Sequence, residues 1–351
     1  MYNIFYKRQI VLPAKNCGGQ RMYMTTGRPF IGHALENLKR FLVRCGLDYD
    51  AGVGYTAALV EDGEIIATGS LDGATIKCVA VAPEHQGEDL CARILTQLRG
   101  EAFERGITQL TLFTKPANEA MFAAFGFYPL ARTADCLLME NSRDGLERYL
   151  ANIPSPAAGT VGCIVANCNP FTLGHRYLIE TAASMCDYLH VFILSEDRGI
   201  LPPETRLRVA REACADIKNA AFHPTGIYMV SAATFPDYFI RDKARSGAIF
   251  CELDLKLFAA RIAPALRISR RFVGTEPYSE TTRAYNEAMK RLLPACGVEI
   301  IELPRLEADG AAVSASRVRA LLDAGQLEQA RSLVPECCFR ELLIKSGGTH
   351  P

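Results

Sequence analysis

The 351-residue sequence has no surplus of charge and no long hydrophobic run. Its 39 Lys and Arg residues equal its 39 Asp and Glu residues, and the two kinds are nearly balanced in each half of the chain. Without a basic surface, we do not expect general binding to nucleic acid. No apolar stretch reaches the ~18 residues of a membrane span, and the polar N-terminus is unlike a signal peptide. The sequence therefore predicts a cytoplasmic protein with neither nucleic-acid nor membrane partners.

Motifs of several common sites are also missing. The 13 cysteines form no CxxC pair and the six histidines form no HExxH, so we predict no protein-bound metal site. An odd number of cysteines scattered through apolar runs predicts free thiols in a reducing compartment. No GxxxxGK motif followed by Ser or Thr is present, which excludes a P-loop ATPase. Residues 52–57 fit G-x-G-x-x-A, but they follow a predicted helix and precede a hairpin, the wrong context for a dinucleotide site.

What is present suits a globular protein with about two domains, since 49% of the residues are hydrophobic and 22% are charged. In residues 1–140 apolar spacing and turn signals predict a mixed α+β domain. Asp62-Gly63 between two strand-like runs is a strong hairpin signal. Helices are expected at 29–45, 90–105 and 119–125, and strands at 55–60, 64–68, 75–81, 109–114 and from 126.

Residues 141–160 contain Pro154, Pro156 and Gly159 and are predicted to be a linker. From residue 161 to 351 short apolar runs alternate with helical patterns, which predicts a doubly wound parallel sheet of the Rossmann-like kind, hence an α/β protein. Its strands are expected at 161–165, 188–194, 227–230, 271–273 and 298–303, and its helices at 174–186, 203–217 and 280–293.

The first chemical motif follows the first of these strands. A polar turn leads to Thr172-Leu-Gly174-His175, which fits T-x-G-H at the start of a helix. Ligands of open α/β sheets bind at the carboxyl ends of strands, and a helix N-terminus favours anions. We predict catalytic roles for His175 and Thr172 on the phosphates of ATP, with further contacts from Asn169, Pro170, Phe171 and Gly174. The alternative is a helix-capping Thr beside a buried His.

The second motif, Ser314-Ala-Ser316-Arg317-Val-Arg319, precedes an apolar helical run. Ser316 is the expected N-cap, and the hydroxyl and guanidinium groups of Ser314, Ser316, Arg317 and Arg319 suit a triphosphate. The alternative is a surface helix with solvated arginines. A third loop, Gly274-Thr275-Glu276, ends a predicted strand and is expected to contact adenine or ribose; an ordinary strand-to-helix loop is the alternative.

These motifs together resemble the citrate lyase ligase family, in which a GNAT-like acetyltransferase-type domain precedes an HxGH nucleotidyltransferase-like domain. The resemblance runs through 76–81, 162–165, 169–179, 233–236, 254–256, 271–277 and 314–319. It implies an AMP-forming acid–thiol ligase that joins carbon to sulfur. Acetate and ATP, with Mg²⁺ held mainly by the phosphates, would give acetyl-AMP. The thiol of the CoA-like prosthetic group on the acyl carrier (gamma) subunit of citrate lyase would then accept the acetyl group.

The GNAT-like half departs from its family's acyl-CoA loop, which has the form Q/R-x-x-G-x-G/A. Here the stretch is 86–91, and Asp89 and Cys91 replace two small residues. A carboxylate where backbone amides would hold a pyrophosphate opposes anion binding. We therefore expect a structural or carrier-docking role for this half. Two other functions remain open: an adenylyltransferase of cofactor biosynthesis and a GNAT acetyltransferase.

Overall fold

The computed structural model describes residues 22–345 except 198, 230–234 and 277–278. The chain forms two compact units. The first unit comprises Met1–Gly145 together with Phe235–Ile249, and the second unit comprises Leu146–Thr234 together with Phe250–Pro351. The segment predicted to be a linker, 141–160, contains a helix of its own, α4 (Gly145–Ala151).

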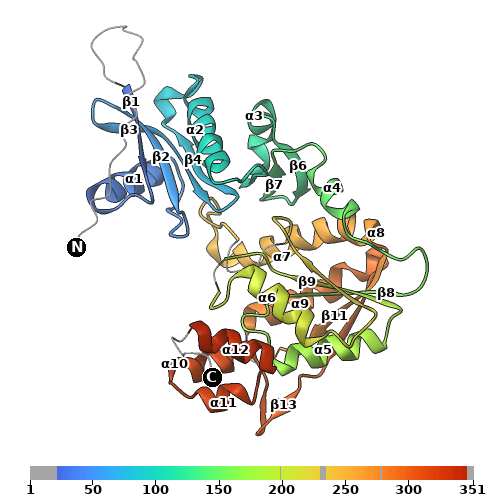
Figure 1. Ribbon diagram of the computed structural model, residues 1–351. Coiled ribbons are helices and arrows are strands. Elements are labelled where there is room, and N and C mark those ends of the chain that lie inside the picture. Colours follow the sequence, from blue (N-terminus) through green and yellow to red (C-terminus); the bar gives the residue numbers. More distant parts are fainter. Residues whose placement is uncertain (1–21, 198, 230–234, 277–278, 346–351) are drawn as a thin grey trace. The chain divides into compact units, whose positions relative to one another are not determined.

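The first unit is built on a seven-stranded sheet with the order β1-β2-β3-β4-β5-β7-β6 (Figure 1). Asp62 and Gly63 form the tight turn between β2 and β3, both with positive φ, as the hairpin signal predicts. All neighbouring strands are antiparallel except β4 and β5. The strands are β1 (Met22–Gly27), β2 (Tyr55–Glu61), β3 (Glu64–Asp72), β4 (Thr75–Val81), β5 (Thr111–Thr114), β6 (Tyr128–Arg132) and β7 (Leu137–Glu140).

Helices pack on this sheet because its central strands are apolar on both faces. In β2 every residue from Tyr55 to Val60 is buried, although side chains alternate between the faces of a strand. The helices of this unit are α1 (Gly32–Arg44), α2 (Leu90–Glu104) and α3 (Glu119–Ala124). Ile94 and Leu98 of α2 enter the core with β2 and β3. The Cβ of an alanine at Gly69 would lie 2.7 Å from Ile94, so this glycine lets α2 approach the sheet closely.

The first unit also contains a segment from the second half of the chain, Phe235–Ile249. The sequence does not predict this return. The backbone N–H of Asp48 donates to the carbonyl of Tyr238 at 2.9 Å. The ring of Phe235 packs edge-on against Phe113 at 5.5 Å. Arg245, at the end of the segment, pairs with Asp135. Phe235–Ile249 therefore belongs to the packing of the first half of the chain.

The second unit contains a five-stranded sheet with the order β10-β9-β8-β11-β12, and all its strand pairs are parallel. This order confirms the predicted doubly wound sheet, with the change of winding direction between β8 and β11. The strands are β8 (Val161–Ala166), β9 (Tyr188–Ile193), β10 (Ala220–Pro224), β11 (Ile268–Gly274) and β12 (Glu299–Leu303). The prediction of a strand at 227–230 is wrong: β10 ends before it, a turn follows, and 230 is outside the described residues.

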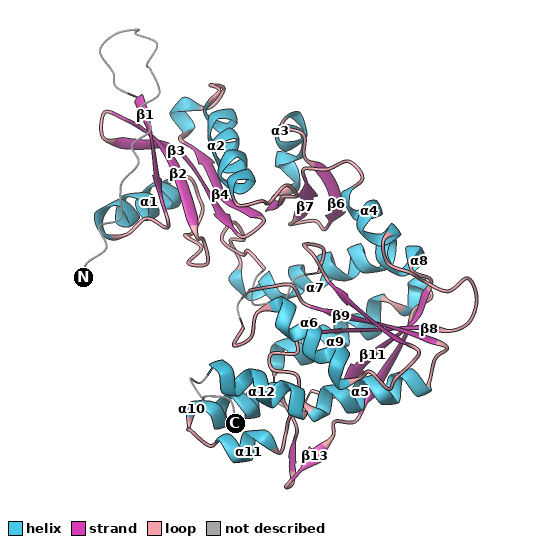
Figure 2. Cartoon of the chain, viewed as in Figure 1, coloured by secondary structure: helices cyan, strands magenta, loops and turns pink. Residues whose placement is uncertain are grey.

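Helices surround this sheet, as Figure 2 shows in cyan. The longer ones are α5 (Leu173–Ser184), α6 (Pro203–Ala213), α7 (Ser246–Leu257) and α9 (Glu280–Leu292). A π-helical turn, η4 (Phe258–Ile262), extends α7 and continues into α8 (Ala263–Ala265). A small hairpin, β13 (Glu307–Ala308) with β14 (Ala311–Ala312), precedes α10 (Ala315–Asp323), α11 (Leu327–Arg331) and α12 (Glu336–Lys345).

Two features concern the whole described chain. Its cysteines are free thiols, and most of them are buried or half-buried. Burial raises the pKa of the Cys163 thiol to about 12, which keeps it protonated and unreactive at neutral pH. No helix among the described residues has the length and apolar character needed to cross a membrane.

Candidate functional site

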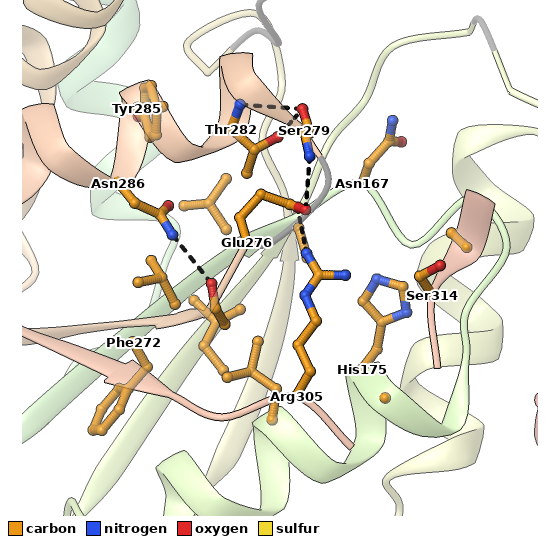
Figure 3. Close-up of a pocket in the computed structure, with 18 of the residues that line it drawn as sticks. Asn167, His175, Phe272, Glu276, Ser279, Thr282, Tyr285, Asn286, Arg305 and Ser314 are labelled. Carbon is orange, nitrogen blue, oxygen red and sulfur yellow. Dashed lines mark hydrogen bonds and ion pairs between the residues drawn. The ribbon is translucent and has the colours of Figure 1, made fainter. Parts of the chain in front are cut away.

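A cavity of about 670 Å³ opens in the second unit where β8 and β11 end. These two strands flank the change of winding direction, where open α/β sheets bind their ligands. Eight of the predicted site residues line it: Thr172, Gly174, His175, Gly274, Glu276, Ser314, Ser316 and Arg319. The structure thus brings all three predicted motifs to one place, although they lie at residues 172–175, 274–276 and 314–319 of the chain (Figure 3).

Thr172 and His175 hold each other at the start of α5. Thr172 is the N-cap, and its hydroxyl accepts a hydrogen bond from the backbone N–H of His175 at 3.3 Å. In return, the Nδ1 atom of His175 accepts from the backbone N–H of Thr172 at 3.0 Å. The Thr172 hydroxyl also lies 2.9 Å from Nδ1. Since Nδ1 is an acceptor, the hydrogen-bond pattern assigns the ring proton to Nε2, leaving that N–H for a ligand.

The His175 ring is neutral at physiological pH. Burial, and then the charge of Arg305, lowers its pKa from 6.5 to about 4. Phe171, fully buried below the loop, packs against the ring with 5.5 Å between centroids. In its neutral form the His175 ring can donate one hydrogen bond, from Nε2, and carries no charge.

Gly174 brings a second helix N-terminus to the cavity. A Cβ at this position would lie 2.5 Å from the backbone oxygen of Val313, the residue before the α10 cap. Only a glycine fits there without shifting the main chain, so α5 and the start of α10 pack closely. Both helix N-termini line the cavity, and each carries a partial positive charge.

The prediction that Ser316 caps α10 is wrong. The cap is Ser314, whose hydroxyl accepts from the backbone N–H of Arg317 at 3.2 Å, while Ser316 lies in the first turn. Arg317 is not among the residues that line the cavity. Its guanidinium donates to the carbonyl of Ala308 at 2.8 Å and pairs with Asp309, which ties α10 to the β13–β14 hairpin.

Arg319 and Asn169 link the loops around the cavity. The Nη1 atom of Arg319 donates to the carbonyl of Asn169 at 2.6 Å. The Oδ1 atom of Asn169 accepts from the backbone N–H of Ile200 at 2.8 Å. Asn169 and Phe171, with Pro170 between them, thus shape the loop from outside the cavity lining, and Arg319 both lines the cavity and anchors that loop.

The loop after β11 brings in a residue that the sequence analysis missed. Arg305, which follows β12, donates from Nε to the carbonyl of Thr275 and pairs through Nη2 with Glu276. Glu276 also accepts from the backbone N–H of Ser279 at 3.0 Å. Figure 3 shows Arg305 extending between Glu276 and His175. The sequence did offer one sign of this role, because Arg305 closely follows a predicted strand of the parallel sheet, where ligands of such sheets bind. Of the predicted loop, Thr275 supports Arg305 with its main chain instead of lining the cavity.

Two further features bear on ligands. Arg271 on β11 and Tyr285 on α9 also line the cavity, and the sequence analysis assigned neither of them. Among the described residues no group of three or more His, Cys, Asp or Glu side chains could hold a metal ion.

The chain matches two families in sequence. Residues 161–342 match the citrate lyase ligase C-terminal domain, and residues 23–127 match the acetyltransferase (GNAT) family. It is 42% identical to a citrate (pro-3S)-lyase ligase of Klebsiella pneumoniae over 90% of this chain and 94% of that protein. With the one of Escherichia coli (strain K12) it shares 39% identity over 86% of this chain and 88% of that protein.

Among solved structures, TmcAL of Thermotoga maritima bound with alpha-thio ATP is 14% identical, with a TM-score of 0.34, over 54% of this chain and 56% of that one. The sequence matches cover both halves of the chain and include the three motifs that meet at the cavity. The chain belongs to the citrate lyase ligase family.

Proposed function

We propose that this chain uses ATP and acetate to acetylate the prosthetic-group thiol on the acyl carrier subunit of citrate lyase, through acetyl-AMP. One observation carries the phosphate chemistry: two capped helix N-termini and the Nε2–H group of His175 line one cavity. Such a site supplies several fixed donors for phosphate oxygens. The family supports citrate lyase as the protein that is activated.

In the first step, a carboxylate oxygen of acetate bonds to the α-phosphorus of ATP. The bond from that phosphorus to the oxygen bridging the β-phosphate breaks, and its electron pair leaves with pyrophosphate. His175 donates from Nε2 to the oxygen on which negative charge develops, and Thr172 keeps the ring in that orientation. A neutral donor suits this role, because it needs no proton from solution and works over a wide pH range.

In the second step, the sulfur of the carrier thiol bonds to the acetyl carbonyl carbon. The bond between that carbon and the phosphate oxygen breaks, AMP leaves with the electron pair, and the thiol proton passes to solvent. The products are a thioester on the carrier and AMP. The enzyme forms no covalent intermediate in either step, so its cysteines are not needed, and most of the described ones are buried.

The remaining predicted residues fit the nucleotide. The N-termini of α5 and α10, with Ser314, Ser316 and Arg319, face the β- and γ-phosphates in this proposal, and Mg²⁺ enters as the magnesium complex of ATP. Gly274 and Glu276 lie where adenine or ribose would contact the end of β11.

Pyrophosphate release tests the proposal. We expect release from ATP to require acetate, and free AMP and the acetylated carrier to form only when deacetylated citrate lyase is added. An adenylated product that retains AMP would instead support an adenylyltransferase. Acetylation of the carrier from acetyl-CoA, without ATP, would support a GNAT acetyltransferase and contradict the proposal.

A further inference from the structure

Arg271 is a buried cation that the proposed phosphate chemistry does not use. Its side chain lies on β11 and lines the cavity, yet the residue is only 4% exposed. Its Nε and Nη1 atoms have no hydrogen-bond partner within the described part of the chain. Buried guanidinium groups normally have acceptors for their N–H groups, because desolvating an unpaired charge is costly. Two partnerless nitrogens at a cavity wall therefore call for an acceptor supplied by a ligand.

Aromatic rings enclose this guanidinium. The centre of the Phe258 ring lies 4.4 Å from the Cζ atom of Arg271, which is stacking distance for a cation on an aromatic face. The centre of the Tyr285 ring lies 5.8 Å from the same Cζ atom, and Phe250 stacks on Tyr285 with 6.0 Å between centroids. Phe258, Phe250 and Met289 also line the cavity. The lining around Arg271 thus combines this cation and the nearby Asp254 carboxyl with apolar side chains, which suits a small anion with an apolar end.

The acidic neighbour of Arg271 does not use up its donors. Tyr285 stands between the two charges: its hydroxyl accepts from Nη2 of Arg271 at 3.3 Å and donates to Oδ2 of Asp254. Burial raises the pKa of the Asp254 carboxyl, although Arg271 and Tyr285 oppose that rise. Asp254, which also lines the cavity, thus balances part of the buried charge through Tyr285, whereas Nε and Nη1 of Arg271 are buried without a partner among the described residues.

We infer that Arg271 binds the carboxylate of the acid substrate, with Phe258 and its apolar neighbours enclosing the methyl group of acetate. The inference rests on the proposed function and names the acid subsite of that same cavity. A carboxylate supplies the anionic oxygens that a guanidinium binds best, whereas adenine offers none. β11, which carries Arg271, pairs with β8, whose carboxyl end leads to the turn that holds His175. Arg271, proposed to bind the acid, and His175, proposed to act on the phosphates, thus come from the adjacent strands β11 and β8 and the segments that follow them, and they line one cavity.

Substitution of Arg271 tests the inference by separating the two substrates. In R271Q we expect the KM for acetate to rise by about 10- to 100-fold, the value of a lost charge-assisted hydrogen bond, with the KM for ATP nearly unchanged. R271K keeps the charge but loses the planar guanidinium, so its KM for acetate should lie between those of the parent chain and R271Q. R211Q is the matched control, because Arg211 of α6 donates to the carbonyl of Phe222 at 2.8 Å and lies outside the cavity lining.

Acetate binding is also measured without turnover, by saturation-transfer NMR of acetate in the presence of α,β-methylene-ATP. The signal should be strong with the parent chain and R211Q and weak with R271Q. If R271Q fails to fold, the double variant R271M/D254N removes the buried charge together with its acidic neighbour and takes its place in both measurements.

The outcomes separate the inference from the proposed function. Unchanged acetate binding and KM in the Arg271 variants overturn the acid subsite while acetate-dependent pyrophosphate release still stands. A rise in the KM for ATP alone assigns Arg271 to a phosphate and also overturns it. Arg271-dependent acetate binding by a chain that releases no pyrophosphate supports the subsite and contradicts the proposed function.

Discussion

The two units treat their buried polar groups differently. In the first unit, Lys77 is 2% exposed and its ammonium group pairs at 2.8 Å with both Asp50 and Asp72. Buried Glu101 likewise receives both Arg28 and Arg105. These groups are satisfied within the fold, so they stabilise or specify it without offering anything to a ligand.

In the second unit, two buried or half-buried polar side chains that line the cavity are only partly paired. His175 has one ring nitrogen held by Thr172 and the other available, and Arg271 has two nitrogens without a partner in the described chain. Arg99 of the first unit also has an Nε atom without a partner among the described residues, but it does not line the cavity. The comparison teaches that incomplete pairing at a cavity, more than the presence of charge, marks a group that can bind a ligand. It also leads to four predictions, taken from the largest expected effect to the smallest.

Replacing His175 by Asn should lower the rate of carrier acetylation by about 100- to 1000-fold, because one preorganised donor is worth ~3 kcal/mol in the transition state. The measurement is pyrophosphate release with saturating ATP and acetate. H33N is the control, since His33 is an exposed residue of α1 in the first unit. If H175N kept near-full activity, His175 would have no role in the mechanism, and its partly paired ring would not mark a catalytic site.

Alanine at two helical glycines should act in opposite directions in the two units. At Gly174 the new Cβ meets the Val313 carbonyl at 2.5 Å, and overpacking of this kind typically costs about 1–3 kcal/mol. G174A should therefore lower the melting temperature and reduce activity about tenfold, since it separates the helix N-termini. At Gly100 of α2 nothing lies within 4 Å, so G100A should stabilise its helix by about 0.5–1 kcal/mol without changing activity. Equal behaviour of the two variants would show that the α5–α10 contact is dispensable.

Several of these residues show which features of the fold and of the site could be predicted from the sequence. The parallel sheet and its first loop were predictable, because an apolar run followed by Thr172-Leu-Gly174-His175 is a local signal. The return of Phe235–Ile249 to the first unit was not, since it depends on packing between segments more than a hundred residues apart. Arg305 and Arg271 were missed for the same reason. Each lies in or beside an ordinary strand, and only the tertiary structure shows that Arg271 has two nitrogens without a partner among the described residues and that Arg305 pairs with Glu276. Ser316 was the predicted cap, but α10 begins at Ala315, which makes Ser314 the cap.

Acid should weaken the second unit before the first. Burial lowers the pKa values of His175, His190 and His223 to about 4, and all three lie in the second unit. As the pH falls from 6.5 to 4 the unfolded chain takes up protons that the folded chain refuses, so stability declines across that window. For His175 alone we expect a loss of about 1 kcal/mol at pH 5, reduced because the ring is partly exposed to the cavity.

Hydrogen exchange resolves this effect by region. Peptides from β9 and β10, which carry His190 and His223 with 3.1 Å between ring nitrogens, should lose protection between pH 7 and pH 5 after correction for the intrinsic rate. Peptides from β2 and β3, which contain no histidine, should change less. An equal loss of protection in the β9–β10 and β2–β3 peptides would mean that acid destabilises both units alike, contrary to the prediction.

The smallest effect is expected at the acyl-CoA loop of the first unit. Asp89 is the N-cap residue of α2 and makes no capping hydrogen bond with its side chain, so its exposed carboxylate stands at the end of the helix that would attract a pyrophosphate. The double variant D89N/C91A should leave acetate-dependent pyrophosphate release unchanged, because all the described residues that line the cavity belong to the second unit. Isothermal titration with acetyl-CoA should detect no binding to the parent chain. If the parent chain binds acetyl-CoA and the variant binds it more tightly, the first unit also holds a ligand site, and the pairing of Lys77 and Glu101 within it would no longer identify it as a structural half.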